Sequence, residues 1–222
     1  MDISADQVRT AIVSLIAFIL SVAVHEFGHA WMATKLGDRL PAQQGRLTLS
    51  PMAHIDPIGT LLMPLVAVFA PGNFPMLAWG KPVQTNPNAY TRLSPRTGHM
   101  LVALAGPAMN LVLATAISIV LILVGRTGIL PPSIAAAAIT YFLQLNIILM
   151  FFNLLPLPPL DGGSVLAGLL PENLRYISDF LQRYGILIFF ALFLSGAMRA
   201  VMRPAYVVAV LWCDAVMRLM AG

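Results

Sequence analysis

The sequence predicts an all-α polytopic membrane protein with five to six membrane-inserted helices. Hydrophobic residues make up 59% of the 222 positions and charged residues only 10%, and the mean hydropathy is +0.83. A water-soluble domain of this size needs more charge to cover its surface. Uncharged runs such as "AIVSLIAFILSVA" at residues 11–23 are typical of helices that cross a bilayer.

The predicted helices follow the apolar runs. We expect the first, at about 8–36, to stay in the mature protein, because "MDISADQVRT" at 1–10 carries two aspartates against one arginine and so lacks the basic start of a signal peptide. Each later run is close to the roughly 20 residues that a helix needs to cross hydrocarbon. These runs lie at about 97–124, 135–155, 181–198 and 201–220.

The region between the first helix and the second is less regular. The stretch 58–80 is apolar, but proline and glycine interrupt it, so it is expected to be re-entrant or to make one short crossing. The interrupting residues are Pro64, Pro71, Gly72 and Pro75. Apolar and polar residues alternate in "GRLTLS" at 45–50, a pattern that favours a short strand. We therefore expect a small β-strand and re-entrant region here.

The basic residues predict the orientation. If 58–80 dips into the membrane and returns, nine lysines and arginines gather on one side and four on the other. The nine are Lys35, Arg39, Arg46, Lys81, Arg92, Arg96, Arg175, Arg183 and Arg218. Because short loops rich in Lys and Arg stay in the cytoplasm, we expect this side to be cytoplasmic, in the inner membrane of a bacterium.

Composition also excludes some classes. The net charge is +4, but the basic residues are scattered singly, so we expect no nucleic-acid partner. The single cysteine, Cys213, excludes an intramolecular disulfide and a Cys-based zinc cage. It is interpreted as a small apolar helix residue.

The motif "HEFGH" at 25–29 lies in the first predicted helix. His25 and His29 are four residues apart and share one helix face, so both imidazoles can bind one metal ion. Neutral imidazole suits zinc, and Glu26 lies within reach of a water activated there. Gly28 lacks a side chain and would let another helix approach closely.

The alternative is a chance match or a hydrogen-bonded pair of core histidines. In a soluble protein that alternative would carry real weight. Within a transmembrane helix, however, a charged side chain costs about 2.5 to 3.5 kcal/mol or more, so ionisable groups there indicate function. The position of "HEFGH" in an apolar run therefore favours the metal site.

A catalytic zinc site needs a third protein ligand. Asp161, in "FNLLPLPPLDGG" at 152–163, is the best candidate, because the topology places it at the same membrane depth as His25 and His29. The alternative is that Asp161 is only the N-cap of a helix that begins in "GGSVLAGLL".

Three motifs in this order resemble the site-2 protease family of intramembrane zinc metalloproteases. They are "HEFGH" at 25–29, "GPAMN" at 106–110, and the pattern N-x-x-P-x-P-x-x-D-G formed by Asn153, Pro156, Pro158, Asp161 and Gly162. The resemblance implies that His25, His29 and Asp161 bind one catalytic zinc and that Glu26 is the catalytic base.

The resemblance also assigns residues around the metal. It implies that Asn153 holds the substrate or stabilises the oxyanion. Gly106, Pro107 and Asn110 would lie in the helix that packs against the metal helix. From the sequence alone, His54 is a second candidate for binding a substrate carbonyl or oxyanion, although it could equally cap a turn.

The domain organisation is expected to be simple. Residues 1–222 form a single membrane-embedded metalloprotease domain, with a catalytic core at about 8–165 and accessory helices at about 181–220. Many members of the family carry a PDZ or CBS domain, for which 222 residues leave no room. The chain thus resembles the compact form of the family.

The predicted function is that of a zinc metalloendopeptidase which hydrolyses a peptide bond in or near a transmembrane helix. Its partners would be a transmembrane protein substrate and the lipid bilayer, and homo-oligomerisation is left open. The active site would face the cytoplasmic side. Two alternatives are a zinc-binding but inactive scaffold of the same fold and an ion or proton transporter, which would more often show paired halves.

Overall fold

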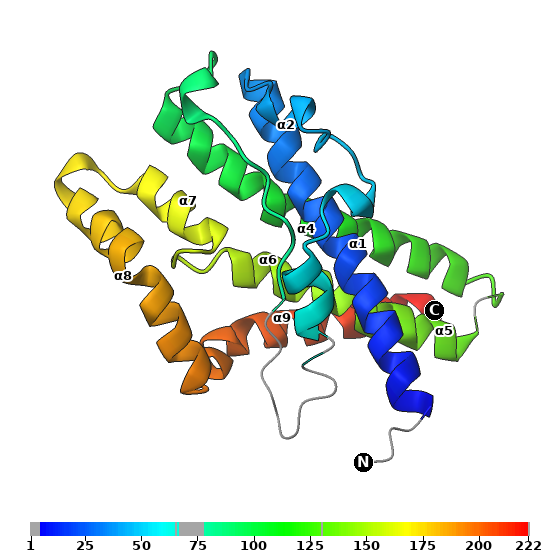
Figure 1. Ribbon diagram of the computed structural model, residues 1–222. Coiled ribbons are helices and arrows are strands. Elements are labelled where there is room, and N and C mark those ends of the chain that lie inside the picture. Colours follow the sequence, from blue (N-terminus) through cyan, green and yellow to red (C-terminus); the bar gives the residue numbers. More distant parts are fainter. Residues whose placement is uncertain (1–4, 65, 67–77, 130, 222) are drawn as a thin grey trace.

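The computed structural model describes residues 5–64, 66, 78–129 and 131–221, and helices dominate them (Figure 1). The longest are α1 (Ala5–Leu36), α4 (Pro95–Gly125), α8 (Arg175–Leu194) and α9 (Met198–Ala221). Shorter helices are α2 (Leu40–Gln43), α5 (Pro132–Ala138), α6 (Gln144–Asn153) and α7 (Asp161–Leu169). Short 3-10 and π-helical segments are η1 (Pro51–Ala53), η2 (Pro57–Leu62), η3 (Pro87–Ala89), η4 (Ile139–Leu143) and η5 (Glu172–Leu174).

Five helical stretches of the described chain are long and apolar enough to cross a membrane, which confirms the all-α polytopic class. They are Val8–Leu36, Pro95–Gly125, Ser133–Asn153, Glu172–Leu194 and Met198–Ala221. The third combines α5, η4 and α6 into one stretch. The fourth begins earlier than the predicted 181, because its first turns contain charged residues that break the apolar run.

Helix α1 packs closely against α4 (Figure 1). Gly28 faces α4, where a Cβ atom would lie 2.8 Å from Cγ of Met109. This confirms that the missing side chain lets the two helices approach. Small residues at such an interface allow close packing where no hydrophobic force drives helices together in lipid.

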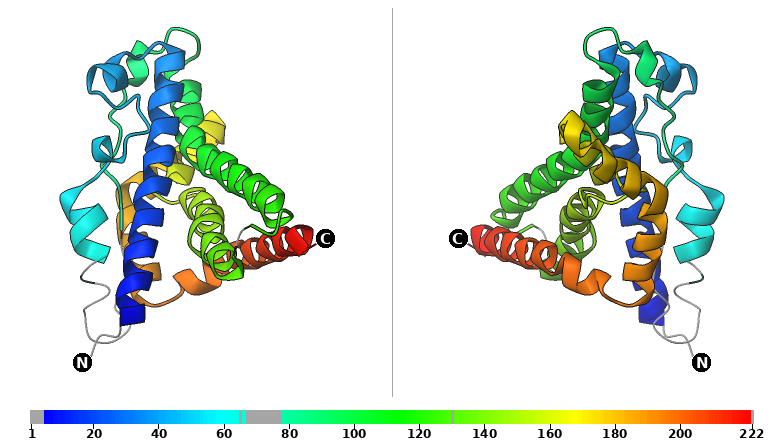
Figure 2. Two further views of the ribbon diagram at one scale, coloured as in Figure 1. Left: turned by 90° about the vertical axis from the view of Figure 1, so that its right-hand side faces the viewer. Right: turned by 90° about the vertical axis from the view of Figure 1, so that its left-hand side faces the viewer.

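A second packing centre joins α4, η4, α6 and α9, which contact one another (Figure 2). Its buried members are Ala114, Leu121, Ile139, Leu143, Ile147, Ala209, Cys213 and Val216. Cys213 is thus a small apolar helix residue, as predicted. Helix α8 packs separately against α9 and the loop after α6, around Leu157 and Phe189.

The strand predicted at 45–50 is wrong: no strand occurs among the described residues. Gly45 has a φ of +68° and ends the turn after α2. The Arg46 side chain donates to the carbonyls of Ala53 and Lys81, and His54 Nε2 donates to the Thr48 carbonyl at 2.9 Å. Side chains therefore supply hydrogen bonds to backbone carbonyls here, which in a β-sheet would come from the backbone of a neighbouring strand.

The stretch 58–80 is described only in part. Its start forms η2, and Asp56 caps that segment by accepting from the backbone N–H groups of Ile58 and Gly59. Residues 65 and 67–77 lie outside the described residues, so the choice between a re-entrant segment and a short crossing stays a prediction.

Residues 78–86 form an extended segment beside α1. Hydrogen bonds hold both ends of the segment: Trp79 N donates to the Gly59 carbonyl at 3.2 Å, and Asn86 N donates to Oδ2 of Asp38 at 2.6 Å. Between them Lys81 N donates to the His54 carbonyl at 2.9 Å. Segment 78–86 is thereby held against the half of α1 that carries "HEFGH".

Candidate metal centre

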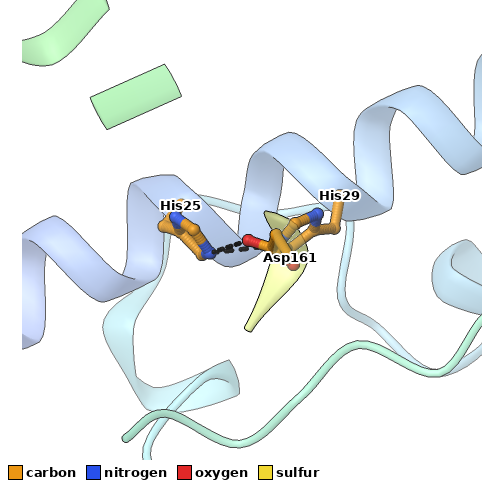
Figure 3. Close-up of side chains that lie close together, drawn as sticks. All are labelled: His25, His29 and Asp161. Carbon is orange, nitrogen blue, oxygen red and sulfur yellow. Dashed lines mark hydrogen bonds and ion pairs between the residues drawn. The ribbon is translucent and has the colours of Figure 1, made fainter. Parts of the chain in front are cut away.

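His25 and His29 lie one turn apart on α1 and face the same way (Figure 3). Their rings meet edge to face with centroids 4.6 Å apart, and their Nε2 atoms are 3.0 Å apart. Both side chains are about nine-tenths buried. The helical spacing thus brings the two Nε2 atoms close to one point.

Asp161 is brought to that point by α7. Its Oδ2 atom lies 3.2 Å from Nε2 of His25 and 3.4 Å from Nε2 of His29 (Figure 3). One ligand atom from each of the three residues lies within 4.8 Å of the others. Leu160 is the N-cap of α7 and Asp161 its first helical residue, with no side-chain cap bond. The capping alternative therefore does not describe Asp161 here.

The outer nitrogens of the two rings are both engaged. Nδ1 of His29 lies 2.7 Å from the Val102 carbonyl, which can only accept, so Nδ1 carries the proton. Nδ1 of His25 lies 2.7 Å from Oδ1 of Asn110. With both protons on Nδ1, each Nε2 presents a lone pair.

The inner atoms form a set of lone pairs with no proton among them. Oδ2 of Asp161 is buried and has no hydrogen-bond partner among the described residues. Two imidazole nitrogens and one carboxylate oxygen fit a divalent cation such as zinc.

Glu26 lies next to this set on α1 and is 9% exposed. Its Oε2 atom accepts a hydrogen bond from Val83 N, in segment 78–86, at 3.0 Å. Gly80 makes the close passage of this segment possible, since a Cβ there would overlap with the Val22 side chain. The backbone of segment 78–86 therefore fixes the carboxylate.

A cavity of about 460 Å³ opens onto the site. His25, Glu26, His29 and Asp161 all line it, together with parts of segment 78–86, α4, α6 and α7. Asn153 lines the same cavity, and its Nδ2 donates to the Leu149 carbonyl at 3.0 Å. The structure thus brings all these predicted residues together.

His54 lies elsewhere: it does not line this cavity. The residue is 1% exposed. Its carbonyl accepts from Lys81 N in segment 78–86, and its Nε2 donates to the Thr48 carbonyl in the loop that follows α2. Its Nδ1 is buried and has no partner in the part of the chain that the structure describes.

The "GPAMN" residues lie directly behind the metal ligands on α4. A Cβ atom at Gly106 would overlap with the His29 ring and lie 2.7 Å from Cε1 of His25, so only glycine fits. Pro107 and Asn110 are fully buried beside it. Gly106 therefore brings the α4 backbone into contact with both imidazoles.

Two contributors escaped the sequence analysis. His99 on α4 also lines the cavity; it lies seven residues before Gly106 and so on the same helix face, a spacing that could have indicated it. Arg96 on α4 donates to the Ala167 and Leu170 carbonyls at the end of α7. No sequence pattern indicated that contact, because it joins residues far apart in the chain.

Comparison with known proteins agrees with this geometry. The sequence matches peptidase family M50 over residues 13–132 and 130–196. The chain belongs to peptidase family M50, the site-2 protease family. The resemblance found in the three motifs is thereby confirmed.

The similar relatives of this M50 chain cover most of its length. It is 37% identical to "Putative zinc metalloprotease YwhC" of Bacillus subtilis, over 82% of this chain and 80% of the relative. It is 32% identical to "Putative zinc metalloprotease Rip2" of Mycolicibacterium smegmatis, over 88% of this chain and 74% of the relative. "Zinc metalloprotease MJ0392" of Methanocaldococcus jannaschii is 26% identical over 81% of this chain and 40% of the relative. No solved structure matches at a comparable level.

Proposed function

We propose that this M50 chain is a zinc-dependent endopeptidase that hydrolyses a peptide bond in or near a transmembrane helix of another membrane protein. The observation that carries the proposal is the convergence of His25, His29 and Asp161 on one point, with Glu26 in the same cavity. The names of the relatives as zinc metalloproteases support the metal and the reaction class.

The three ligand residues would hold the zinc, with their lone pairs already directed inward. The chemistry that zinc supplies in such a site is to acidify a water molecule and to polarise a carbonyl group. Val102 and Asn110 keep the histidine protons on Nδ1. The protein therefore presents the metal-binding form of both rings.

Glu26 would act as the general base. Val83 N–H binds one carboxylate oxygen and leaves the other to take the proton from the attacking water. Glu26 would then return that proton to the leaving nitrogen. Asn153, which lines the same cavity, would bind the substrate carbonyl.

The substrate class follows from the surroundings of the cavity. Its walls include residues of α1, α4 and α6, which belong to helical stretches long and apolar enough to span a membrane, so a substrate would arrive through the bilayer. A transmembrane helix hides its carbonyls in its own hydrogen bonds. Substrates whose helices unwind easily would therefore be cleaved in preference.

One assay tests this function against the inactive-scaffold and transporter alternatives. Purified protein is supplied with zinc and a single-span membrane protein, and cleavage fragments are measured. The wild-type protein is expected to produce fragments and Glu26→Gln none. Glu172, the other glutamate of the sequence, lies on the surface, and Glu172→Gln is the matched control that should cleave normally. Absence of product from the wild type with several substrates, despite bound zinc, would favour the scaffold.

A further inference from the structure

Behind His25, three buried polar side chains join three helices. Ser21 lies on α1, Asn110 on α4 and Asn146 on α6, and each is 0% exposed. Polar groups buried this deeply are costly unless they are hydrogen-bonded. Hydrogen bonds connect these three side chains to one another and to His25.

The first link fixes the amide of Asn146. Its Nδ2 donates to the Phe142 carbonyl at 2.7 Å and to Oγ of Ser21 at 2.9 Å. The Ser21 hydroxyl uses its own proton on the Ala17 carbonyl at 2.7 Å. Because both carbonyls can only accept, the amide of Asn146 cannot turn over without placing oxygen against oxygen.

The second link transmits this orientation to Asn110. With its nitrogen committed, Asn146 presents Oδ1, which accepts from Nδ2 of Asn110 at 2.9 Å. The same nitrogen lies 3.3 Å from the Ser21 carbonyl. Asn110 must therefore present its own oxygen to Nδ1 of His25, at 2.7 Å.

We propose that Asn146 is a positioning residue for the metal centre: through Asn110 it holds the His25 proton on Nδ1 and so keeps the Nε2 lone pair directed at the metal. The proposal rests on the role of His25 as a zinc ligand. In this proposal Asn110 orients His25 in addition to packing α4 against α1. Helix α6 then supports the ligands on α1 as well as leading to Asp161 on α7.

His29 provides an internal comparison. Its Nδ1 bonds directly to the backbone carbonyl of Val102, so no side chain relays its orientation. Loss of Asn146 should therefore disturb His25 and spare His29. A general loosening of the fold would disturb both rings.

The test uses the full-length protein with Asn146→Leu, and Gln144→Leu as the matched amide-to-leucine control on the same helix. Zinc affinity is measured by competition with a chromophoric chelator. Removing the hydrogen-bond partner of a metal ligand typically weakens metal affinity by about 10- to 100-fold. Asn146 acts through such a partner, Asn110, so Asn146→Leu is expected to lie at the lower end of that range and bind zinc about tenfold more weakly. Gln144→Leu should bind as the wild type does.

A spectroscopic measurement separates positioning from a structural role. The chain has four histidines, so nitrogen-15 histidine labelling of the zinc-loaded protein gives few Nδ1–H signals. In Asn146→Leu the His25 signal should move as its hydrogen bond weakens, whereas the His29 signal should stay. If Asn146→Leu is not recovered folded, Asn146→Ala takes its place with the same expectations.

Two results would overturn the proposal. One is a zinc affinity within about twofold of the wild type in the Asn146 variant, and the other is equal movement of the His25 and His29 signals. The ligand assignment is tested separately, by zinc binding to the wild type and its loss in His25→Ala. The two ideas can therefore fail independently.

Discussion

Each of the three proposed metal ligands would supply one electron pair to a shared point, and their ligand atoms lie within 4.8 Å of one another. We therefore predict that His25→Ala, His29→Ala and Asp161→Ala each lose stoichiometric zinc, because three protein ligands are the usual set for a catalytic site. Glu26→Gln should keep zinc. Metal analysis of the purified variants measures this, and full occupancy in Asp161→Ala would remove that residue from the ligands.

Gly106 yields a second prediction at this scale. In Gly106→Ala the new methyl group overlaps with the imidazole of His29, so the rings or α4 must move and zinc occupancy should fall well below that of the wild type. Ala108 lies exposed on the same helix, and Ala108→Val adds more volume there without touching the site. The zinc content of the two variants is compared. A normal content in Gly106→Ala would show that α1 and α4 can separate enough to hold the added methyl group without disturbing the ligands.

At this scale the sequence predicts which side chains meet where chemistry restricts the choice. His25, His29 and Asp161 converge as expected, because few residue types bind zinc and residues at helical spacing lie on one face. The bond between Val83 N and Glu26 was not predictable in this way, because any residue has a backbone N–H. The relay from Asn146 to His25 likewise depends on how three helices meet.

At the scale of elements, α7 must be held in place, because it carries Asp161. Arg96 donates from α4 to two carbonyls at the far end of this helix, and hydrogen bonds to a charged group contribute about 1.5 to 3 kcal/mol. We predict that Arg96→Ala loosens α7 and lowers zinc affinity.

Hydrogen exchange over 161–169 and zinc titration measure this effect. Arg175→Ala is the control, because Arg175 pairs with the same Glu172 as Arg96 does, and Glu172 lies outside α7. Similar exchange in both variants would show that α7 is held by other contacts.

Elements were predictable in proportion to their length. The five long apolar runs predicted to be helices are helical in the part of the chain that the structure describes, because burying backbone groups in lipid leaves few other structures. The six-residue alternation at 45–50 did not become a strand. Arg46 and His54 satisfied the neighbouring carbonyls instead, and a short alternation does not reveal whether a partner strand exists.

For the whole molecule, the distribution of basic residues predicts that the C-terminal end of α1 and the end of the segment from Asn153 to Asp161 face the cytoplasm. Cysteines at positions 39, 92 and 175, which are exposed, test this in a Cys213→Ser background. An impermeant reagent added outside intact cells should leave all three unlabelled. Strong labelling at position 92 would make 58–80 a true crossing. Position 38 is unsuitable, because the Asp38 carboxylate binds Leu40 N and Asn86 N.

The distance along the chain between the metal ligands determines when the site can mature. A ribosome delivers His25 and His29 with the first membrane-spanning helix, whereas Asp161 emerges only after the third has been made. Until α4 inserts, neither imidazole has the partner that orients its outer nitrogen. A nascent or truncated chain that ends before Asp161 thus carries two of the three proposed ligands, and under the function proposed above it could not yet cut its neighbours in the membrane.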